Sequence, residues 1–240
     1  MENAINTALS LQTATFRKLN VVSNNVANAS TKGFKGQEVL FQNYITDEGN
    51  NKKLAMVSDV GSFDNKEMGS FTVTNRPLDI AIQGDGYFVI DTPLGTRYSR
   101  AGNFYVNQDG VLSTADQHPV LSADLQQITI PTSAKNISFT SSGAIVVDGE
   151  ETQTLAVANF EPDNFLEHVG NGKYKASTDS VPASGYQVLQ GMLEEANVKS
   201  VTELKTLIDV QRSAGLISEF INSVGELERN SISKLTNSIK

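Results

Sequence analysis

The sequence contains no cysteine. This absence excludes a disulfide framework and a thiolate metal site, and it makes the chain indifferent to the redox state of its compartment. Histidine is scarce: His118 and His168 are the two present, and they lie far apart in the sequence. They predict neither a zinc site nor a histidine-based catalytic triad, and we expect both on the surface.

Long apolar runs and basic stripes are also missing. Nowhere do about 18 apolar residues follow one another, so we expect no direct membrane insertion. The first residues lack the cationic and apolar segments of a cleaved signal peptide. The 27 acidic residues outweigh the 19 basic ones and give a net charge of -8, which disfavours nucleic acid as a partner.

Two segments at the ends of the chain have the apolar spacing of helices. From Ala4 to Val26 apolar residues recur at gaps of three, four or seven, and Gly33 then offers a residue that tolerates a left-handed backbone. The same periodicity returns from Val198 to the end and includes Ile239. Some 40 helical residues would span roughly 60 Å, which is longer than a lid over a small domain needs.

The middle of the chain has the pattern of strands. Between Val39 and Tyr186, runs of β-branched and aromatic residues alternate with turn residues, which favours an all-β domain. Gly84-Asp85-Gly86 lacks the third glycine of a dinucleotide fingerprint and predicts a hairpin turn between two strands, so no cofactor is expected. The polar segment 47–65 predicts an irregular linker.

The predicted fold class is therefore α+β, with N- and C-terminal helices that pair as a coiled-coil-like helical domain and a central all-β domain. The boundaries are residues 1–35 for the first part of the helical domain, 36–68 for the linker, 69–186 for the β domain and 187–240 for the second part of the helical domain.

The apolar stripes of the two helices favour assembly. A lone helix in water is marginal, and one antiparallel pair leaves much of both stripes exposed, so neighbouring subunits would cover the rest. Head-to-tail contacts that fail to close build open helical arrays. The alternative is that both helices fold back over the β core as ordinary core helices.

Three blocks of sequence resemble one family. The block Asn24-Asn25-Val26-Ala27-Asn28-Ala29-Ser30-Thr31-Lys32-Gly33-Phe34-Lys35 resembles the N-terminal signature of the flagellar rod, hook and hook-associated proteins. Residues 76–89, extended by 98–104, are similar to the β core of that family, and residues 190–198 are similar to the element before its C-terminal helix. The chain departs from the pattern at Ala214 and Gly215, where the family usually has an aromatic and an acidic residue.

This resemblance implies a structural rod subunit of the bacterial flagellar basal body. The paired helices would form the inner wall of a hollow drive shaft that transmits torque to the distal rod and hook. The implied partners are copies of the chain, other proximal and distal rod subunits, and the flagellar type III export apparatus, which would deliver it to the periplasm without a cleaved signal peptide. The sequence is most similar to proximal-rod members, and a distal-rod or hook-type subunit is the alternative.

We expect no catalytic, cofactor-binding or metal-binding residues. The functional residues would lie at subunit interfaces, where the amides of Asn24, Asn25 and Asn28 would bond backbone across the contact. Glu194 would order or line the interface, and it points away from Glu195, so the two do not form an acid and base pair. The predicted interface residues are Ile5, Leu9, Phe16, Leu19, Val22, Asn24, Asn25, Val26, Asn28, Gly33, Phe34, Glu194, Asn197, Val198, Leu204, Leu207, Ile208, Ile217, Ile221 and Val224.

Two functions of other classes stay open at this point. The β domain could be an adhesin or glycan-binding module with a helical oligomerisation stalk, although the pattern shows few exposed aromatics. A cell-wall hydrolase would need a nucleophile motif, a metal site or paired carboxylates, and the sequence offers none that is recognisable.

Overall fold

The computed structural model describes residues 2–47, 53–160, 166–178 and 180–237. They form two compact units. The first unit comprises the residues up to Ala27, residues 37–65 and the residues from Lys199 onward, and the second comprises residues 28–36 and 66–198. The N- and C-terminal parts of the sequence thus belong to one unit, and the middle belongs to the other.

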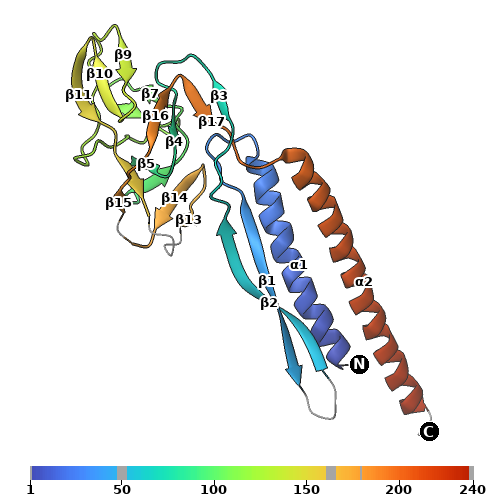
Figure 1. The fold of residues 1–240 in the computed structure, drawn as a ribbon. Helices are drawn as coiled ribbons and strands as arrows, with labels where there is room; N and C mark the ends of the chain where they lie inside the picture. The colour runs from blue at the N-terminus through green and yellow to red at the C-terminus, as the bar shows by residue number, and fades with distance from the viewer. Residues whose placement is uncertain (1, 48–52, 161–165, 179, 238–240) are drawn as a thin grey trace. The chain divides into compact units, whose positions relative to one another are not determined.

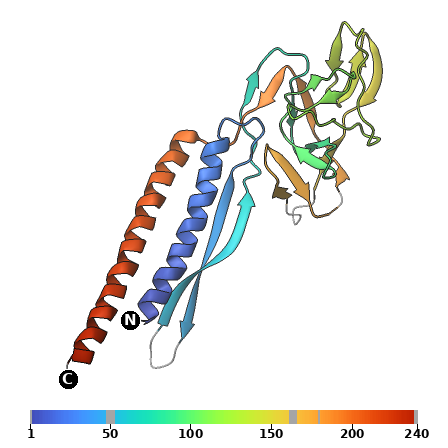
Figure 2. The ribbon, with the colours of Figure 1, turned by 180° about the vertical axis from the view of Figure 1, so that it is seen from behind.

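Two long helices lie side by side in the first unit (Figure 1) (Figure 2). Helix α1 covers Glu2–Asn28 and helix α2 covers Ser200–Asn237, which confirms both predicted terminal helices and the α+β fold class. The helices run antiparallel, and the Gln12 side-chain amide donates a hydrogen bond to the Ser218 hydroxyl at 3.3 Å. Ile239, which we assigned to the second helix, lies outside the described residues.

A long hairpin packs beside α1. Strands β1 (Gln37–Asp47) and β2 (Lys53–Asp64) pair antiparallel, with a bulge between Leu40 and Phe41. The prediction of an irregular linker over 47–65 was wrong for Asp47 and for residues 53–64, and residues 48–52 lie outside the described residues. A two-stranded hairpin is marginal by itself, and this one is supported by α1, where the Ser10 hydroxyl accepts a hydrogen bond from the Val57 N–H at 3.4 Å. This support comes from a helix distant in sequence, so the polarity of the segment itself does not predict the hairpin.

The second unit is all-β. Its strands are β3 (Phe71–Val73), β4 (Ile80–Gln83), β5 (Tyr87–Ile90), β6 (Arg97–Ser99), β7 (Tyr105–Val106), β8 (Leu112–Ser113), β9 (Ile137–Phe139), β10 (Ala144–Val147), β11 (Glu150–Thr154), β12 (Val157–Asn159), β13 (Leu166–His168), β14 (Lys173–Ala176), β15 (Val181–Pro182), β16 (Gln187–Gln190) and β17 (Met192–Glu194). A six-stranded sheet has the order β13-β14-β6-β5-β12-β15, and β11-β10-β9 form a three-stranded sheet. Three strand pairs, β16-β4, β17-β3 and β7-β8, complete the unit.

The core of this unit is apolar and closely packed. The rings of Phe88 and Phe104 meet edge to face, with their centroids 5.1 Å apart. Isoleucines from β4, β5 and β10 surround this pair and are fully buried. Such burial stabilises each side chain by about 1.5–3 kcal/mol, so the unit has a core of its own.

The turn at Gly84-Asp85-Gly86 does not join a hairpin. Strand β4 pairs with β16, whereas β5 pairs with β6 and β12. The positive φ angles of Gly84 (105°) and Gly86 (141°) redirect the chain from one sheet to another. The predicted turn is therefore present, but the hairpin prediction was wrong because strand partners are set by contacts distant in sequence.

Neither of the two described helices is both long and apolar enough to cross a bilayer.

Candidate functional site

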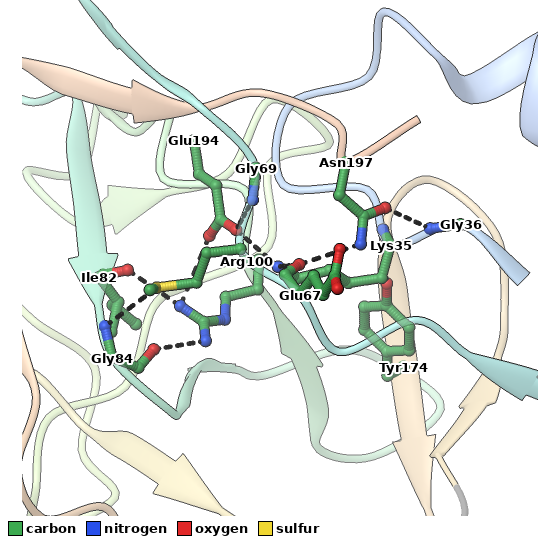
Figure 3. Close-up of polar contacts among 11 residues, drawn as sticks. Lys35, Gly36, Glu67, Gly69, Ile82, Gly84, Arg100, Tyr174, Glu194 and Asn197 are labelled. Carbon is green, nitrogen blue, oxygen red and sulfur yellow. Dashed lines mark hydrogen bonds and ion pairs between the residues drawn. The ribbon is translucent and has the colours of Figure 1, made fainter. Parts of the chain in front are cut away.

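The segment after α1 and the segment before α2 meet within the second unit. The Gly33 N–H donates a hydrogen bond to the Glu194 carbonyl at 2.7 Å, and the Asn197 N–H donates to the Phe34 carbonyl at 3.2 Å. The Asn197 side-chain oxygen accepts a further bond from the Gly36 N–H at 2.7 Å (Figure 3). We call this region the signature junction; it comprises residues 33–36, residues 194–197 and the β-unit residues that contact them.

A buried carboxylate stands at the centre of the signature junction (Figure 3). One oxygen of Glu194 accepts hydrogen bonds from Lys35 Nζ at 2.6 Å and from the Gly69 N–H at 3.1 Å. The other oxygen lies 3.4 Å from a guanidinium nitrogen of Arg100. The three charged side chains are at most 4% exposed, so one anion is enclosed between two cations.

Arg100 connects this carboxylate to the β sheets. Its guanidinium donates to the Ile82 carbonyl at 3.0 Å and to the Gly84 carbonyl at 2.6 Å, and it lies 5.4 Å from the centre of the Tyr87 ring. A planar guanidinium can hold several acceptors at once in a fixed geometry. The turn at Gly84, which we took for a hairpin, thus supplies part of the junction.

Lys35 contributes the second cation from the N-terminal signature. Its ammonium also donates to the Glu67 carbonyl at 2.7 Å, and its backbone N–H donates to the Tyr174 hydroxyl at 3.3 Å. Burial lowers the pKa of Lys35, and the nearby Glu194 carboxylate partly opposes that change. The ion pair with Glu194 thus favours the charged form of Lys35, whereas burial favours the neutral form.

The junction leaves no room for a side chain at Gly33. Its φ is +66°, in the left-handed region, as the sequence predicted for this residue. A Cβ atom there would lie 2.4 Å from the Arg100 carbonyl carbon and 2.6 Å from the Ala101 nitrogen. Glycine is thus required for both conformation and close approach.

The two adjacent carboxylates, Glu194 and Glu195, are both engaged by cationic side chains. The Glu194 carboxylate is occupied by three donors, and Glu195 pairs with Lys32, whose hydrogen bond lowers the pKa of Glu195. Across the described residues, no group of three or more histidine, cysteine or acidic side chains is placed to hold a metal ion.

We predicted that both histidines lie on the surface, but neither is fully exposed. His168 lies between Phe34 and Tyr174, with ring centroids 5.7 and 4.5 Å away, and His118 Nδ1 lies 3.1 Å from Lys173 Nζ. Both are half-buried. His168 packs against aromatic rings and His118 lies beside Lys173, and the contacts with Phe34 and Lys173 join residues that are distant in sequence.

The Asn25 side chain forms hydrogen bonds with backbone, but with the backbone of its own chain. Its side-chain oxygen accepts from the Gln37 N–H and its side-chain nitrogen donates to the Gln37 carbonyl, both at 2.9 Å. The prediction that this amide bonds across a subunit contact was wrong, since the side chain is only 5% exposed. An amide suits this position because it supplies a donor and an acceptor together. The Asn28 side-chain oxygen accepts from the Thr31 hydroxyl at 3.3 Å, and Asn24 is exposed.

The remaining predicted interface residues fall into three groups. Val22, Gly33, Phe34, Glu194 and Val224 are buried in their own chain, so their contacts are internal. Ile5, Leu19, Val26, Asn197, Val198, Leu207, Ile217 and Ile221 are half-buried. Leu9, Phe16, Leu204 and Ile208 are exposed.

Five exposed apolar residues on the helices were missed: Leu11, Val201, Leu216, Phe220 and Leu227. A helical-wheel count over both helices could have found Leu11, Leu216, Phe220 and Leu227, because they lie outside the single stripe that the spacing analysis followed. Val201 lies within that stripe but was not assigned to the interface. Together with the exposed predicted residues they give both helices apolar surfaces of the kind that marks interaction sites. Such surfaces are typical of subunits that join a larger assembly.

Comparisons with known proteins identify that assembly. Residues 5–35 match the family model of the flagella basal body rod protein, and residues 81–147 match that of the flagellar hook protein FlgE/F/G D1 domain. The rod protein FlgF of Mesorhizobium japonicum is 34% identical over 216 residues, which cover 89% of each chain. FlgG of Bacillus subtilis is 34% identical over 238 residues, covering 88% of this chain and 90% of that protein. FlgF of Caulobacter vibrioides is 32% identical over 251 residues, covering 98% of each.

The chain belongs to the flagellar basal-body rod protein family and is FlgF-like, which confirms the resemblance seen in its sequence. These relatives are structural rod proteins, so the chain is a structural protein of the flagellar basal body and not an enzyme. The signature junction unites all three blocks that carried the resemblance: Lys35 comes from the first, Arg100 and Gly84 from the second, and Glu194 from the third.

Proposed function

We propose that this chain polymerises through α1 and α2 into the hollow drive shaft of the rod and transmits torque to the distal rod and hook. The observation that carries the proposal is the exposure of large apolar side chains on both helices. Leu9, Phe16 and Leu204 are 44%, 46% and 46% exposed, and Leu216 is 68% exposed. Covering each of them would stabilise an assembly by about 25 cal/mol per Å² of apolar surface.

The signature junction suits a part that bears torque. It ties the segment that follows α1 to the segment that precedes α2 through backbone bonds and a buried ion cluster. Removing one member of such a cluster leaves an unpaired buried charge, which costs about 3–5 kcal/mol. Force applied to either helix would therefore meet a junction that resists separation.

The neighbours would be copies of the chain and other proximal and distal rod subunits. We further propose that the type III export apparatus delivers the chain to the periplasm without a cleaved signal peptide. A distal-rod position is the second candidate, because the Bacillus subtilis FlgG relative is as similar as the Mesorhizobium japonicum FlgF relative.

A substitution on an exposed helix face tests polymerisation. Leu204→Asp changes a side chain that is 46% exposed, so the stability of the isolated chain should change by less than about 0.5 kcal/mol. In cells that carry this variant as their single copy, we expect loss of the chain from basal bodies and loss of motility. The matched control is Thr202→Asp, also exposed and also on α2.

Blotting the exported fraction separates a failure of export from a failure of assembly. Two changes at half-buried positions, Leu19→Asp and Leu207→Asp, should abolish assembly as well while the β unit stays folded. Motile cells with normal basal bodies in all three variants would contradict polymerisation through the helices.

A further inference from the structure

A polar pocket of about 260 Å³ lies in the second unit, beside the segment that follows α1. Thr31 and Lys32 line it from that segment, Asp116 from the turn after β8, and Lys173 from strand β14. The buried ion cluster of the signature junction lies outside its lining. Pockets for drug-sized ligands usually have volumes of about 300–1,000 Å³, so this one suits a smaller group, such as an amino-acid side chain.

Lys173 brings to this pocket an ammonium group that its own chain does not fully use. Its Nζ donates to Asp116 Oδ2 and lies 3.1 Å from His118 Nδ1. An ammonium has three protons, so one of them has no acceptor among the described residues. Because the Lys173 side chain is only 10% exposed, a ligand in the pocket is well placed to supply the third acceptor.

Other donors of the same lining are also unused. The Thr114 hydroxyl accepts from the His118 N–H at 3.3 Å, and its own proton has no acceptor within the described part of the chain. The half-buried Asn103 side chain forms no hydrogen bond with any described residue. The Lys32 ammonium pairs with Glu195 and keeps further protons for another acceptor. The pocket therefore offers several donors to whatever enters it.

The charges of the lining indicate which kind of group would use these donors. The lining contains two ammonium groups, those of Lys32 and Lys173, and one carboxylate, that of Asp116. The hydrogen bond from Lys173 lowers the pKa of Asp116, so Asp116 stays ionised at neutral pH and donates nothing. A carboxylate accepts up to about four hydrogen bonds and donates none, whereas an amide would bring two more donors. A ligand carboxylate is thus the better match.

We propose that this pocket binds a single carboxylate group carried on a short aliphatic stem. The residues Ile90, Ala101 and Ala115 complete the lining and would contact the stem. An acidic side chain of a neighbouring protein and a free short-chain acid carry the same group, so either can be its source. The inference does not depend on polymerisation, because the pocket lies in the β unit and not on the helices.

Titration of the purified full chain with propionate tests this binding. Propionate has the carboxylate and a short stem, and propionamide has nearly the same shape but no charge. In NMR spectra we expect propionate to cause saturable shifts of the Thr114 and Asn103 amide signals in the millimolar range. Propionamide should bind at least about tenfold more weakly. Equal binding of the two compounds, or no saturable shift with propionate, would overturn the proposal.

Two substitutions locate the binding site. Asn103→Asp keeps the size of the side chain and adds a negative charge to the lining, and Lys173→Met keeps the stem and removes the ammonium. Each should weaken propionate binding at least about tenfold. The matched control, Lys175→Met, removes an ammonium from an exposed position of β14 outside the lining and should leave binding unchanged. Unchanged binding in Asn103→Asp and Lys173→Met, or an equal loss in Lys175→Met, would contradict the site.

Cells that carry Asn103→Asp as their single copy distinguish the two sources of the carboxylate. If an acidic side chain of a neighbouring protein enters the pocket, the amount of the variant in basal bodies should fall several-fold while its export is unchanged. If the ligand is a free acid, that amount should stay normal although the purified variant fails to bind propionate. Absence of the unmodified chain from basal bodies would instead refute the proposed function and leave the propionate result standing.

Discussion

Replacing Glu194 with glutamine removes the negative charge between Lys35 and Arg100 while keeping the shape of the side chain. Lys35 and Arg100 would then be two buried cations without a counter-ion. Loss of one partner from a buried ion pair costs about 3–5 kcal/mol, because the remaining charge is neither solvated nor paired. A domain is stable by only about 5–15 kcal/mol, so Glu194→Gln should place the β unit close to unfolding.

The neighbouring carboxylate provides the matched control. Glu195 also forms an ion pair, with Lys32, but their side chains are 26% and 36% exposed. Solvent screens such a pair, and its loss should cost no more than about 1 kcal/mol. The two variants differ by one position in sequence and by the same chemical change, so burial is what separates their effects.

The loss of folding stability caused by Glu194→Gln should depend on pH, because Lys35 titrates differently in the folded and unfolded chains. The folded-state pKa of Lys35 is below its ordinary value of 10.5, so in the window between the two the unfolded chain binds more protons and stability rises with pH. The Glu194 carboxylate opposes this lowering, so the pKa of Lys35 should be still lower in the variant. The pH range over which stability rises should therefore begin nearer to neutral pH in the variant. The variant should therefore regain part of its stability as pH rises toward about 10.

Urea unfolding of the full chain, followed by tyrosine fluorescence and circular dichroism, measures these differences. We expect a loss of about 3–5 kcal/mol for Glu194→Gln at pH 7 and at most about 1 kcal/mol for Glu195→Gln. Equal losses for the two variants, or a Glu194→Gln deficit that grows as pH rises, would refute the claim that the junction is held by a buried ion cluster.

Three further substitutions test other parts of the structure. Gly33→Ala should cost about 2–4 kcal/mol, because the new methyl group would overlap the backbone of Arg100 at a positive φ; a neutral effect in urea unfolding would show that the junction can relax. Asn25→Asp loses the donor to the Gln37 carbonyl and should cost the hairpin about 1–3 kcal/mol, seen as faster hydrogen exchange in residues 37–42 with the β unit unchanged. Gly215→Ala should stabilise α2 by about 0.5–1 kcal/mol, since a Cβ there meets nothing within 4 Å, and a lower melting temperature would contradict this.

Local periodicity was sufficient to predict the helices and the all-β character of the middle. Apolar residues at helical spacing gave α1 and α2 to within a few residues, because a helix is held by bonds between residues close in sequence. Local periodicity could not predict which strands pair with each other. The β4 and β5 segments look like a hairpin with a tight turn, yet β4 pairs with β16 more than a hundred residues away.

The site was predicted unevenly for the same reason. Gly33, Lys35 and Glu194 stand in blocks that the family resemblance marked, but nothing in their spacing showed that they meet. Asn25 was assigned to a subunit contact because an amide that needs both a donor and an acceptor fits many backbone partners, and Gln37 turned out to be in the same chain. A residue's exposure depends on tertiary packing, which is why buried and exposed members stood together in the predicted interface.

Hydrogen exchange of the helices in the free chain and in isolated basal bodies tests most directly whether neighbouring subunits cover the exposed apolar residues of α1 and α2. We predict that residues 5–28 and 200–227 exchange much more slowly in basal bodies than in the free chain, while residues 80–159 of the β unit exchange at similar rates in both. Equal exchange of the helices in the two states would show that α1 and α2 gain no partner on assembly.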